Sequence, residues 1–337
     1  MEKRVSVIMA TYNTPKEYLC KAIDSILNQT YNNIEFIIVC DGSIKDYNVI
    51  KEYNDDRIKC IFHEENKGLP ASLNEAIGFA TGEYIIRMDS DDISLKNRIS
   101  EQVKFLEKYD EIDVCGMYAK VFGKKDYIMT LFMNKPKYIG IQLLYRTCLV
   151  HPTVAFRASI FKDKNIRYNE EYICAQDFEM WSKIYNNNNI AIIPKVGIMY
   201  RMHDKQASIE KQKIQKEFYK KTIKRNVEKF EDFEKDILGK LFLILGEKEE
   251  INRNNYEEVS NYIDILIRNN KRFNERCLRK VIYNRYFQLL LKNNIFKSNL
   301  KNIILNRKIR NKILKIYNLE NILHVCYYKL KGRRKNG

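Results

Sequence analysis

Several features that would point to other classes of protein are missing from this sequence. Its eight cysteines form no Cys-x-x-Cys pair and no other spacing typical of a zinc site, so we expect neither a metal held by sulfur nor a disulfide framework. No stretch reaches the roughly 18 apolar residues that a membrane-spanning helix needs. The apolar run at 5–10 is also too short for the core of a signal peptide. We therefore expect a protein of the reducing cytoplasm, soluble or peripheral on the inner face of the cell membrane.

Acidic residues are scarce in the C-terminal part of the chain. Residues 205–337 contain 33 of the 60 Lys and Arg residues but only 15 of the 43 Asp and Glu residues, whereas the first 204 residues are nearly neutral. Such asymmetry indicates an anionic partner, either nucleic acid or a membrane. Between 300 and 317, apolar positions recur at helical spacing among basic residues, which predicts a basic amphipathic helix. It could dock on an anionic membrane surface, or belong to a helical subdomain that packs on the N-terminal domain or on a second subunit of a homo-oligomer.

Short apolar runs alternate with helix-period segments in the first part of the chain. The expected strands are 5–10, 34–40, 58–62 and 84–88, and the expected helices are 18–27, 44–53, 70–80 and 94–109. This alternation is typical of an α/β fold with a mostly parallel, Rossmann-like central sheet flanked by helices. In such sheets, ligands bind at the carboxyl ends of the strands.

The pattern is less regular further along the chain. The expected elements are β-rich stretches at 114–122 and 150–156, a helix at 176–186, and a strand pair or hairpin over 190–201. After Ser208 the sequence becomes Lys-rich and helix-periodic, without proline. This change predicts two domains, a catalytic domain at 1–208 and a basic α-helical C-terminal region at 209–337.

Polar side chains follow three of the expected strands at the point where each strand ends. These are 11–13 (Thr-Tyr-Asn), Asp41, and the pair Asp89 and Asp91. Two carboxylates at i and i+2 after a strand can point into one cleft and supply the oxygen ligands that Mg²⁺ or Mn²⁺ prefers. A cation there would neutralise charge on a departing diphosphate. For an isolated Asp-x-Asp pattern, a solvated acidic turn is the alternative.

Further segments carry a family resemblance. In order along the chain they are 5–13, 29–31, 41–43, 65–69, 82–92, 151–153, 175–181 and 200–203. Each segment is short, but the ordered set spans residues 5–208. The sequence resembles the family 2 glycosyltransferases of the bacterial surface-glycan type, which have the GT-A fold. Beyond residue 208 the resemblance implies nothing.

The resemblance implies that the donor, a nucleotide sugar expected to be UDP-linked, contacts residues at several of these segments. The implied donor-binding residues are Thr11, Tyr12, Asn13, Asp41, Asn66, Gly68, Asn74, Asp89, Ser90, Arg201 and His203. The metal, Mn²⁺ or Mg²⁺, would be held by Asp89, Asp91 and His203. Taken alone, Asp41 could equally form an Asx-type turn, and a lone histidine is more often structural than a ligand.

The resemblance also implies the chemistry of transfer. Asp177 would be the catalytic base that deprotonates an acceptor hydroxyl, with inversion at the anomeric carbon. Asp177 also lies near an expected helix start, where an acidic residue in the first turn is common for structural reasons. The acceptor side would include His151, Glu179 and Trp181. The acceptor would be a glycan, including a lipid-linked one, in lipopolysaccharide, capsule or other cell-surface polysaccharide synthesis.

Two positions depart from the family pattern. Cys40 stands where the family usually has the first of two acidic residues, and Leu73 stands where many members have an arginine before Asn74. The second departure leaves a phosphate contact to be supplied by another basic residue.

Two other functions fit parts of the sequence. A sugar-nucleotide nucleotidyltransferase would also use a sheet and metal-binding carboxylates, but it usually has a glycine-rich loop after the first strand, where this chain has 11–15 (Thr-Tyr-Asn-Thr-Pro). A basic nucleic-acid-binding protein would explain the C-terminal charge. However, no zinc finger or RNP-like motif is present, so we expect no nucleic-acid partner.

Overall fold

The chain forms two compact units, Met1–Thr222 and Ile223–Gly337. The computed structural model describes residues 2–131, 133–185, 189–203, 212–230, 233–293 and 295. The boundary between the units falls within helix α9 (Gln212–Glu228). The domain boundary expected near residue 208 lies outside the described residues.

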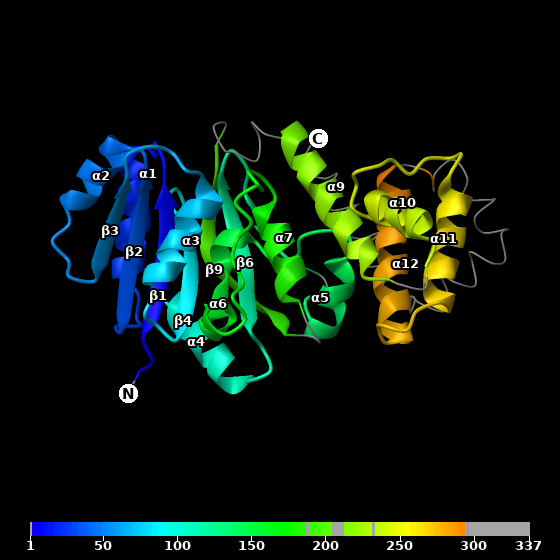
Figure 1. The fold of residues 1–337 in the computed structure, drawn as a ribbon, viewed down its shortest axis with the longest axis horizontal. Coiled ribbons are helices and arrows are strands. Elements are labelled where there is room, and N and C mark those ends of the chain that lie inside the picture. Colours follow the sequence, from blue (N-terminus) through cyan, green and yellow to red (C-terminus); the bar gives the residue numbers. More distant parts are fainter. Residues whose placement is uncertain are drawn as a thin grey trace. The chain divides into compact units, whose positions relative to one another are not determined.

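One sheet organises the first unit, and Figure 1 shows its strands β3, β2, β1 and β4 side by side. The strand order is β3-β2-β1-β4-β8-β6-β9-β5, with β7 beside β6. The strands are β1 (Val5–Thr11), β2 (Ile34–Asp41), β3 (Ile58–His63), β4 (Tyr84–Asp89), β5 (Ile93–Ser94), β6 (Val114–Gly123), β7 (Tyr127–Met129), β8 (Ala155–Arg157) and β9 (Ile190–Met202).

The long pairings of this sheet are parallel. Strands β3, β2, β1 and β4 run in one direction, and β6 pairs in parallel with β9. The shorter strands β5, β7 and β8 pair antiparallel. In the register, Thr11 lies beside Cys40 and Ala10 beside Asp89, so three strands end at the same edge. The predicted mostly parallel α/β sheet is confirmed.

Helices cover both faces of the parallel strands. The described helices of this unit before α9 are α1 (Lys16–Leu27), α2 (Ile44–Lys51), α3 (Leu69–Phe79), α4 (Arg98–Lys108), α5 (Pro136–Gln142), the 3-10 helix η1 (His151–Thr153), α6 (Ser159–Lys162) and α7 (Gln176–Ile184). Val7 and Met9 share one core with α1, α2 and α4. The buried Leu73 and Ala76 of α3 lie outside that core, and α3 packs against β1 and β2 from the opposite face (Figure 1).

Three expected elements differ in the structure. The helix expected over 94–109 begins only at Arg98, because Ser94 pairs with β9 as part of strand β5. The strand pair or hairpin expected over 190–201 is the single strand β9. Pro194 cannot donate a ladder hydrogen bond, and the pairing with β6 skips it, so the break in the pattern is a bulge rather than a turn. The β-rich stretch expected at 150–156 begins as helix η1, which has Pro152 in its first turn, before the short strand β8.

The described part of the second unit is helical, as predicted. It contains α10 (Lys235–Leu245), α11 (Tyr256–Arg268) and α12 (Glu275–Lys292). Each helix contributes fully buried side chains, including Leu241, Ile263 and Ile282. Among the residues that the structure describes, no helix has the length and apolar character to cross a bilayer. The amphipathic helix expected between 300 and 317 lies outside these residues.

Candidate active site at the carboxyl edge of the sheet

Three carboxylates gather where β4 ends. One oxygen of each of Asp89, Asp91 and Asp92 lies within 4.8 Å of the others. Asp89 and Asp91 are about a quarter exposed, with side-chain exposures of 28% and 26%, and Asp92 is fully buried. The strand holds Asp89 in register beside Ala10, and the turn that follows brings Asp91 and Asp92 back toward it. The predicted Asp-x-Asp pair is therefore at the predicted edge, with Asp92 as a third carboxylate.

The electrostatics of this cluster favour a cation. Burial raises the pKa of Asp89 and raises that of Asp92 well above its ordinary value, and the neighbouring carboxylates add to both effects. Arg87 forms an ion pair with Asp89 and opposes these shifts. Among the described residues, Oδ2 of Asp92 is buried without a hydrogen-bond partner. An all-oxygen set with an unpaired acceptor fits Mg²⁺ or Mn²⁺.

The end of β9 lies against this cluster. Nε2 of His203 is 3.0 Å from Oδ2 of Asp91, and Nε of Arg201 donates to the Asp91 carbonyl oxygen at 2.8 Å. The Arg201 guanidinium lies over the rings of Tyr18 and Phe122, 3.9 Å and 4.6 Å from their centroids. Stacking of this kind fixes the plane of the guanidinium. The structure thus brings Arg201 and His203 to Asp91, and their roles there stay predictions.

A chain of hydroxyl groups connects the ends of β1 and β4. Oγ1 of Thr11 is bonded to Asp46 at 2.5 Å and to Thr14 at 3.0 Å, and Oγ1 of Thr14 lies 2.7 Å from Oγ of Ser90. Thr11 is buried, with 2% of its surface exposed. Because its hydroxyl is already committed to these partners, Thr11 shapes the edge rather than presenting a free hydroxyl.

Tyr12 and Asn13 follow Thr11 in the turn. Tyr12 is 54% exposed, so its ring is open to solvent. Asn13 has a left-handed backbone, with φ of +55°, and its side-chain oxygen accepts a hydrogen bond from Ser43 at 3.3 Å. Asparagine tolerates this conformation better than most residues. The turn therefore leaves the Tyr12 ring exposed at the edge, where a planar group could stack.

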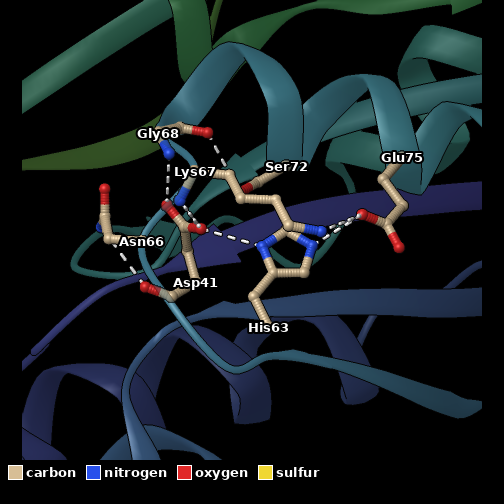
Figure 2. Close-up of polar contacts among 7 residues, drawn as sticks. All are labelled: Asp41, His63, Asn66, Lys67, Gly68, Ser72 and Glu75. Atoms are coloured by element: carbon tan, nitrogen blue, oxygen red, sulfur yellow. Dashed lines mark hydrogen bonds and ion pairs between the residues drawn. The ribbon is translucent and has the colours of Figure 1, made fainter.

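Asp41, at the end of β2, holds the loop before α3 (Figure 2). Its carboxylate accepts hydrogen bonds from the backbone N–H groups of Lys67 and Gly68, at 2.8 and 2.9 Å. The side-chain amide of Asn66 donates to the Asp41 carbonyl oxygen at 3.3 Å. Gly68 has φ of +91°, which favours glycine. The expected donor residues Asp41, Asn66 and Gly68 thus form one connected group.

Asp177 lies in the first turn of α7 and is partly buried. The hydroxyl of Thr147 donates to its Oδ2 at 3.1 Å. Burial raises the pKa of Asp177, while the charge of Arg87 lowers it. Because Arg87 also pairs with Asp89, the two carboxylates share one neighbouring cation. A carboxylate with a raised pKa is a stronger base when ionised, which suits a general base.

The remaining expected residues occupy different environments. The side chain of Asn74 is bonded to the backbone of Tyr168 and to Glu170, so its amide is committed to that loop. Nε2 of His151 lies 2.9 Å from the Tyr168 hydroxyl.

Glu179 and Trp181 are both fully buried in α7. Trp181 packs against His151 and Phe156, with ring centroids 5.8 and 5.7 Å apart. Neither Glu179 nor Trp181 presents a surface to an acceptor in this structure, because α7 turns both side chains into the interior.

The structure adds residues that the motifs did not single out. They are Tyr18, Asp46, His63, Arg87 and Thr147. Of these, Arg87 has a visible signal, a charge between the apolar residues Ile86 and Met88 of strand β4, and its side chain is almost fully buried. A buried charge is costly unless it is paired, so its position marks a site. The others have no such signal, because their contacts join segments far apart in the sequence.

Comparisons with known proteins identify the family. The family described as glycosyl transferase family 2 matches residues 6–165. An uncharacterized glycosyltransferase of Methanocaldococcus jannaschii is 35% identical over 237 residues, which cover 67% of this chain and 81% of that protein. A UDP-Glc:α-D-GlcNAc-diphosphoundecaprenol β-1,3-glucosyltransferase of Escherichia coli is 33% identical over 217 residues, covering 61% and 80%.

The similarity extends to solved structures. Staphylococcus aureus TarS in complex with UDP-GlcNAc has a TM-score of 0.60 at 20% identity, covering 89% of this chain and 92% of that one. At that identity the likeness shows the fold alone. The family match and the identity to the relatives favour a glycosyltransferase over a sugar-nucleotide nucleotidyltransferase. On these grounds the chain belongs to glycosyltransferase family 2, and it is a glycosyltransferase with the GT-A fold.

Proposed function

We propose that this enzyme transfers a sugar from a UDP-sugar to a hydroxyl group of a lipid-linked glycan, with inversion and with a divalent cation, in the synthesis of a cell-surface polysaccharide. The observation that carries the proposal is the gathering of Asp89, Asp91 and Asp92 at the carboxyl edge of the sheet. The E. coli relative is named for a UDP-Glc donor and a diphosphoundecaprenol-linked acceptor, and TarS was solved with UDP-GlcNAc. Both support a UDP-linked donor and, for the relative, a lipid-linked acceptor.

The diphosphate end of the donor would lie at the acidic cluster. Asp89 and Asp91 would hold Mn²⁺ or Mg²⁺, with His203 beside Asp91. The bound cation would neutralise negative charge on the departing diphosphate. The Arg201 guanidinium, which contacts the rings of Tyr18 and Phe122, would add a positive charge near the same group.

The base end of the donor would lie between Tyr12 and Asp41. The exposed ring of Tyr12 would stack on the uracil. An ionised carboxylate offers about four acceptor positions, and three at Asp41 are used by His63, Lys67 and Gly68. The fourth, on Oδ2, could accept the ring N–H of uracil.

Asp177 would act as the base. The acceptor hydroxyl oxygen would attack the anomeric carbon while the bond from that carbon to the diphosphate oxygen breaks, and the hydroxyl proton would pass to Asp177. Attack on the side opposite the leaving group inverts the anomeric configuration. Thr147 would orient the Asp177 carboxylate through its hydrogen bond, and His151 would line the acceptor side.

A donor panel tests the proposal. The purified enzyme is incubated with UDP-, GDP- and other nucleotide sugars, with Mn²⁺ and a lipid-linked glycan acceptor, and release of the nucleoside diphosphate is measured. We expect release with one or more UDP-sugars, and we expect a chelator to abolish it. Transfer from GDP-sugars alone, or transfer unaffected by the chelator, would contradict the donor or the metal part of the proposal.

The basic C-terminal residues could bring the enzyme to its acceptor. A lipid-linked acceptor lies in a membrane, and a basic surface is attracted to anionic lipids. Residues 300–337 lie outside the described residues, so this part of the proposal depends on the sequence alone. Flotation with anionic and neutral liposomes tests it, and equal binding to both would count against docking.

A further inference from the structure

His63 lies between two carboxylates beneath the expected base site (Figure 2). Its Nδ1 is 2.9 Å from Oδ1 of Asp41 and its Nε2 is 2.6 Å from Oε2 of Glu75. His63 ends β3, Asp41 ends the neighbouring strand β2, and Glu75 belongs to α3. The imidazole thus connects two strands and a helix through one line of hydrogen bonds.

This arrangement leaves little freedom to the three side chains. The His63 side chain is 2% exposed and that of Asp41 is 4% exposed. Hydrogen bonds to an ionised carboxylate are shorter and stronger than those between neutral groups. The Lys67 ammonium lies 3.9 Å from Glu75 at the outer end.

The orientation of the Asp41 carboxylate depends on its hydrogen bond with His63. His63 and the Lys67 N–H both donate to Oδ1, whereas Oδ2 receives the Gly68 N–H and, among the described residues, has no further partner. Donors on both sides of Oδ1 fix the plane of the carboxylate, which aims the remaining acceptor position of Oδ2. The backbone at Gly42 also lies close to the loop at 66–68, since a Cβ there would be 2.6 Å from the Asn66 nitrogen.

We propose that His63, supported by Glu75, is a positioning residue for the nucleobase of the donor. His63 holds the Asp41 carboxylate and the loop at 66–68 in the orientation that reads a base with a ring N–H, without contacting the donor itself. The inference rests on the proposed function, since it takes Asp41 as the residue that contacts the base. It adds a residue that influences which base is bound by orienting Asp41, although it does not contact the base.

Such a residue has a distinct experimental signature. It should affect binding of the base, and it should leave the acidic cluster and Asp177 unchanged. Replacing His63 should therefore weaken UMP and UDP by the same factor, because the two ligands share the base and differ at the phosphates. It should raise the KM for the donor and leave kcat nearly unchanged, since the lost interaction is made equally in the ground state and the transition state.

The experiment compares three variants. His63→Gln replaces a ring with nitrogens facing both carboxylates by an amide whose N–H donors lie on a single nitrogen. Glu75→Gln keeps an acceptor without the charge, and Glu35→Gln is the matched control. Glu35 is a buried carboxylate at the opposite end of the same strand, β2, bonded to Ser6, Thr81 and Lys59. UMP and UDP binding are measured by calorimetry, and donor KM and kcat by diphosphate release.

We expect His63→Gln to weaken UMP and UDP about 10-fold, at the lower end of the range for residues that orient a binding group. Glu75→Gln should have a smaller effect, about 3-fold, because the variant keeps an acceptor for His63. Glu35→Gln should bind within twofold of the wild type even though it is less stable. If His63→Gln does not fold, the Glu75→Gln measurement carries the test.

Two results would overturn the inference. In the first, UMP binding by the His63 and Glu75 variants matches that of the Glu35 control, which would make the line structural only and leave the proposed function standing. In the second, wild-type enzyme binds no uridine nucleotide, which would remove the proposed function and the inference together.

Discussion

Buried carboxylates lie at both edges of the parallel strands, and the two edges use these groups differently. At the amino edge, Glu35 is 1% exposed and receives hydrogen bonds from Ser6, Thr81 and Lys59. Burial alone would raise the pKa of Glu35, but these donors outweigh burial and lower it to about 2. At the carboxyl edge, Asp89 and Asp92 have raised pKa values because they are buried close to each other and to Asp91.

The difference has thermodynamic meaning. A carboxyl whose pKa is lower in the folded state stabilises the fold above its ordinary pKa, whereas one whose pKa is raised destabilises the fold there. Glu35 thus stabilises the protein at neutral pH, whereas the acidic cluster costs stability there. Groups that are poorly satisfied by the protein are those that remain available to a ligand. The predictions that follow should separate activity at one edge from stability at the other.

The largest effect is expected at the base. Asp177→Asn removes the group that accepts the hydroxyl proton, so kcat should fall by about 10³- to 10⁴-fold while UDP binding stays unchanged. In the wild type, the raised pKa of Asp177 should place the acid limb of the rate profile above the ordinary value of 3.8, with activity lost as the pH falls through it. Single-turnover kinetics against pH measure both the loss of kcat and the acid limb. Asp126→Asn is the control, because the Asp126 side chain is 75% exposed on the surface. Near-normal turnover in Asp177→Asn would mean that another group is the base.

The next effect is expected at the acidic cluster. Asp91→Ala should lower kcat/KM about 10²- to 10³-fold, the range for loss of one electrostatic group at a reacting centre. Its thermal midpoint without metal should not fall, because the substitution removes a negative charge beside Asp89 and Asp92. Diphosphate release measures the fall in kcat/KM, and calorimetric melting measures the thermal midpoint. A variant that melts well below the wild type would show that Asp91 supports the fold as well as the site.

A third variant should lose stability and keep its activity. Glu35→Gln should lower the free energy of unfolding by about 2–3 kcal/mol, since the shift from 4.5 to about 2 corresponds to roughly 3 kcal/mol. Specific activity of the folded enzyme should stay within twofold. In the wild type, this contribution is present above pH 4.5 and lost as the pH falls toward 2, so urea unfolding between those values should show the loss and the variant should not.

The smallest effect is a thermal shift with metal. A cation that binds only the folded state at 100 times its Kd stabilises it by about 2.7 kcal/mol. We therefore expect Mn²⁺ to raise the midpoint of the wild type by a few degrees and to leave Asp91→Ala unchanged. An equal shift in both proteins would place the bound cation elsewhere.

Much of the parallel half of the sheet could be predicted from the sequence. Apolar runs of four to seven residues that alternate with helix-period segments fix both the element types and their order, because each pattern buries a surface in only one way. Once β1, β2 and β4 are parallel, Asp41 and Asp89 must follow their strands at one edge. The registers of Thr11 with Cys40 and of Ala10 with Asp89 confirm that location. The roles of these residues stay predictions.

The second half of the site was harder to predict. The contact of His203 with Asp91 joins residues 112 positions apart, and it depends on the bulge at Pro194 in β9 and on the pairing of β9 with β6. For Glu179 and Trp181, the sequence predicted a place on the acceptor side that the structure does not show. Their segment resembles a family motif, but the sequence does not state which face of α7 is turned inward, and the structure buries both.

Local pattern in the sequence determined the strands, the helices and the turns that carry acidic residues, since backbone propensity and apolar periodicity act over a few residues. It also determined the charge imbalance between the two parts of the chain. Only the tertiary structure decided which polar groups are satisfied and which remain open. Hydrogen bonds such as those from His63 to Asp41 and Glu75 depend on side chains from three elements meeting within 3 Å, and that distance is set by the packing of the whole sheet.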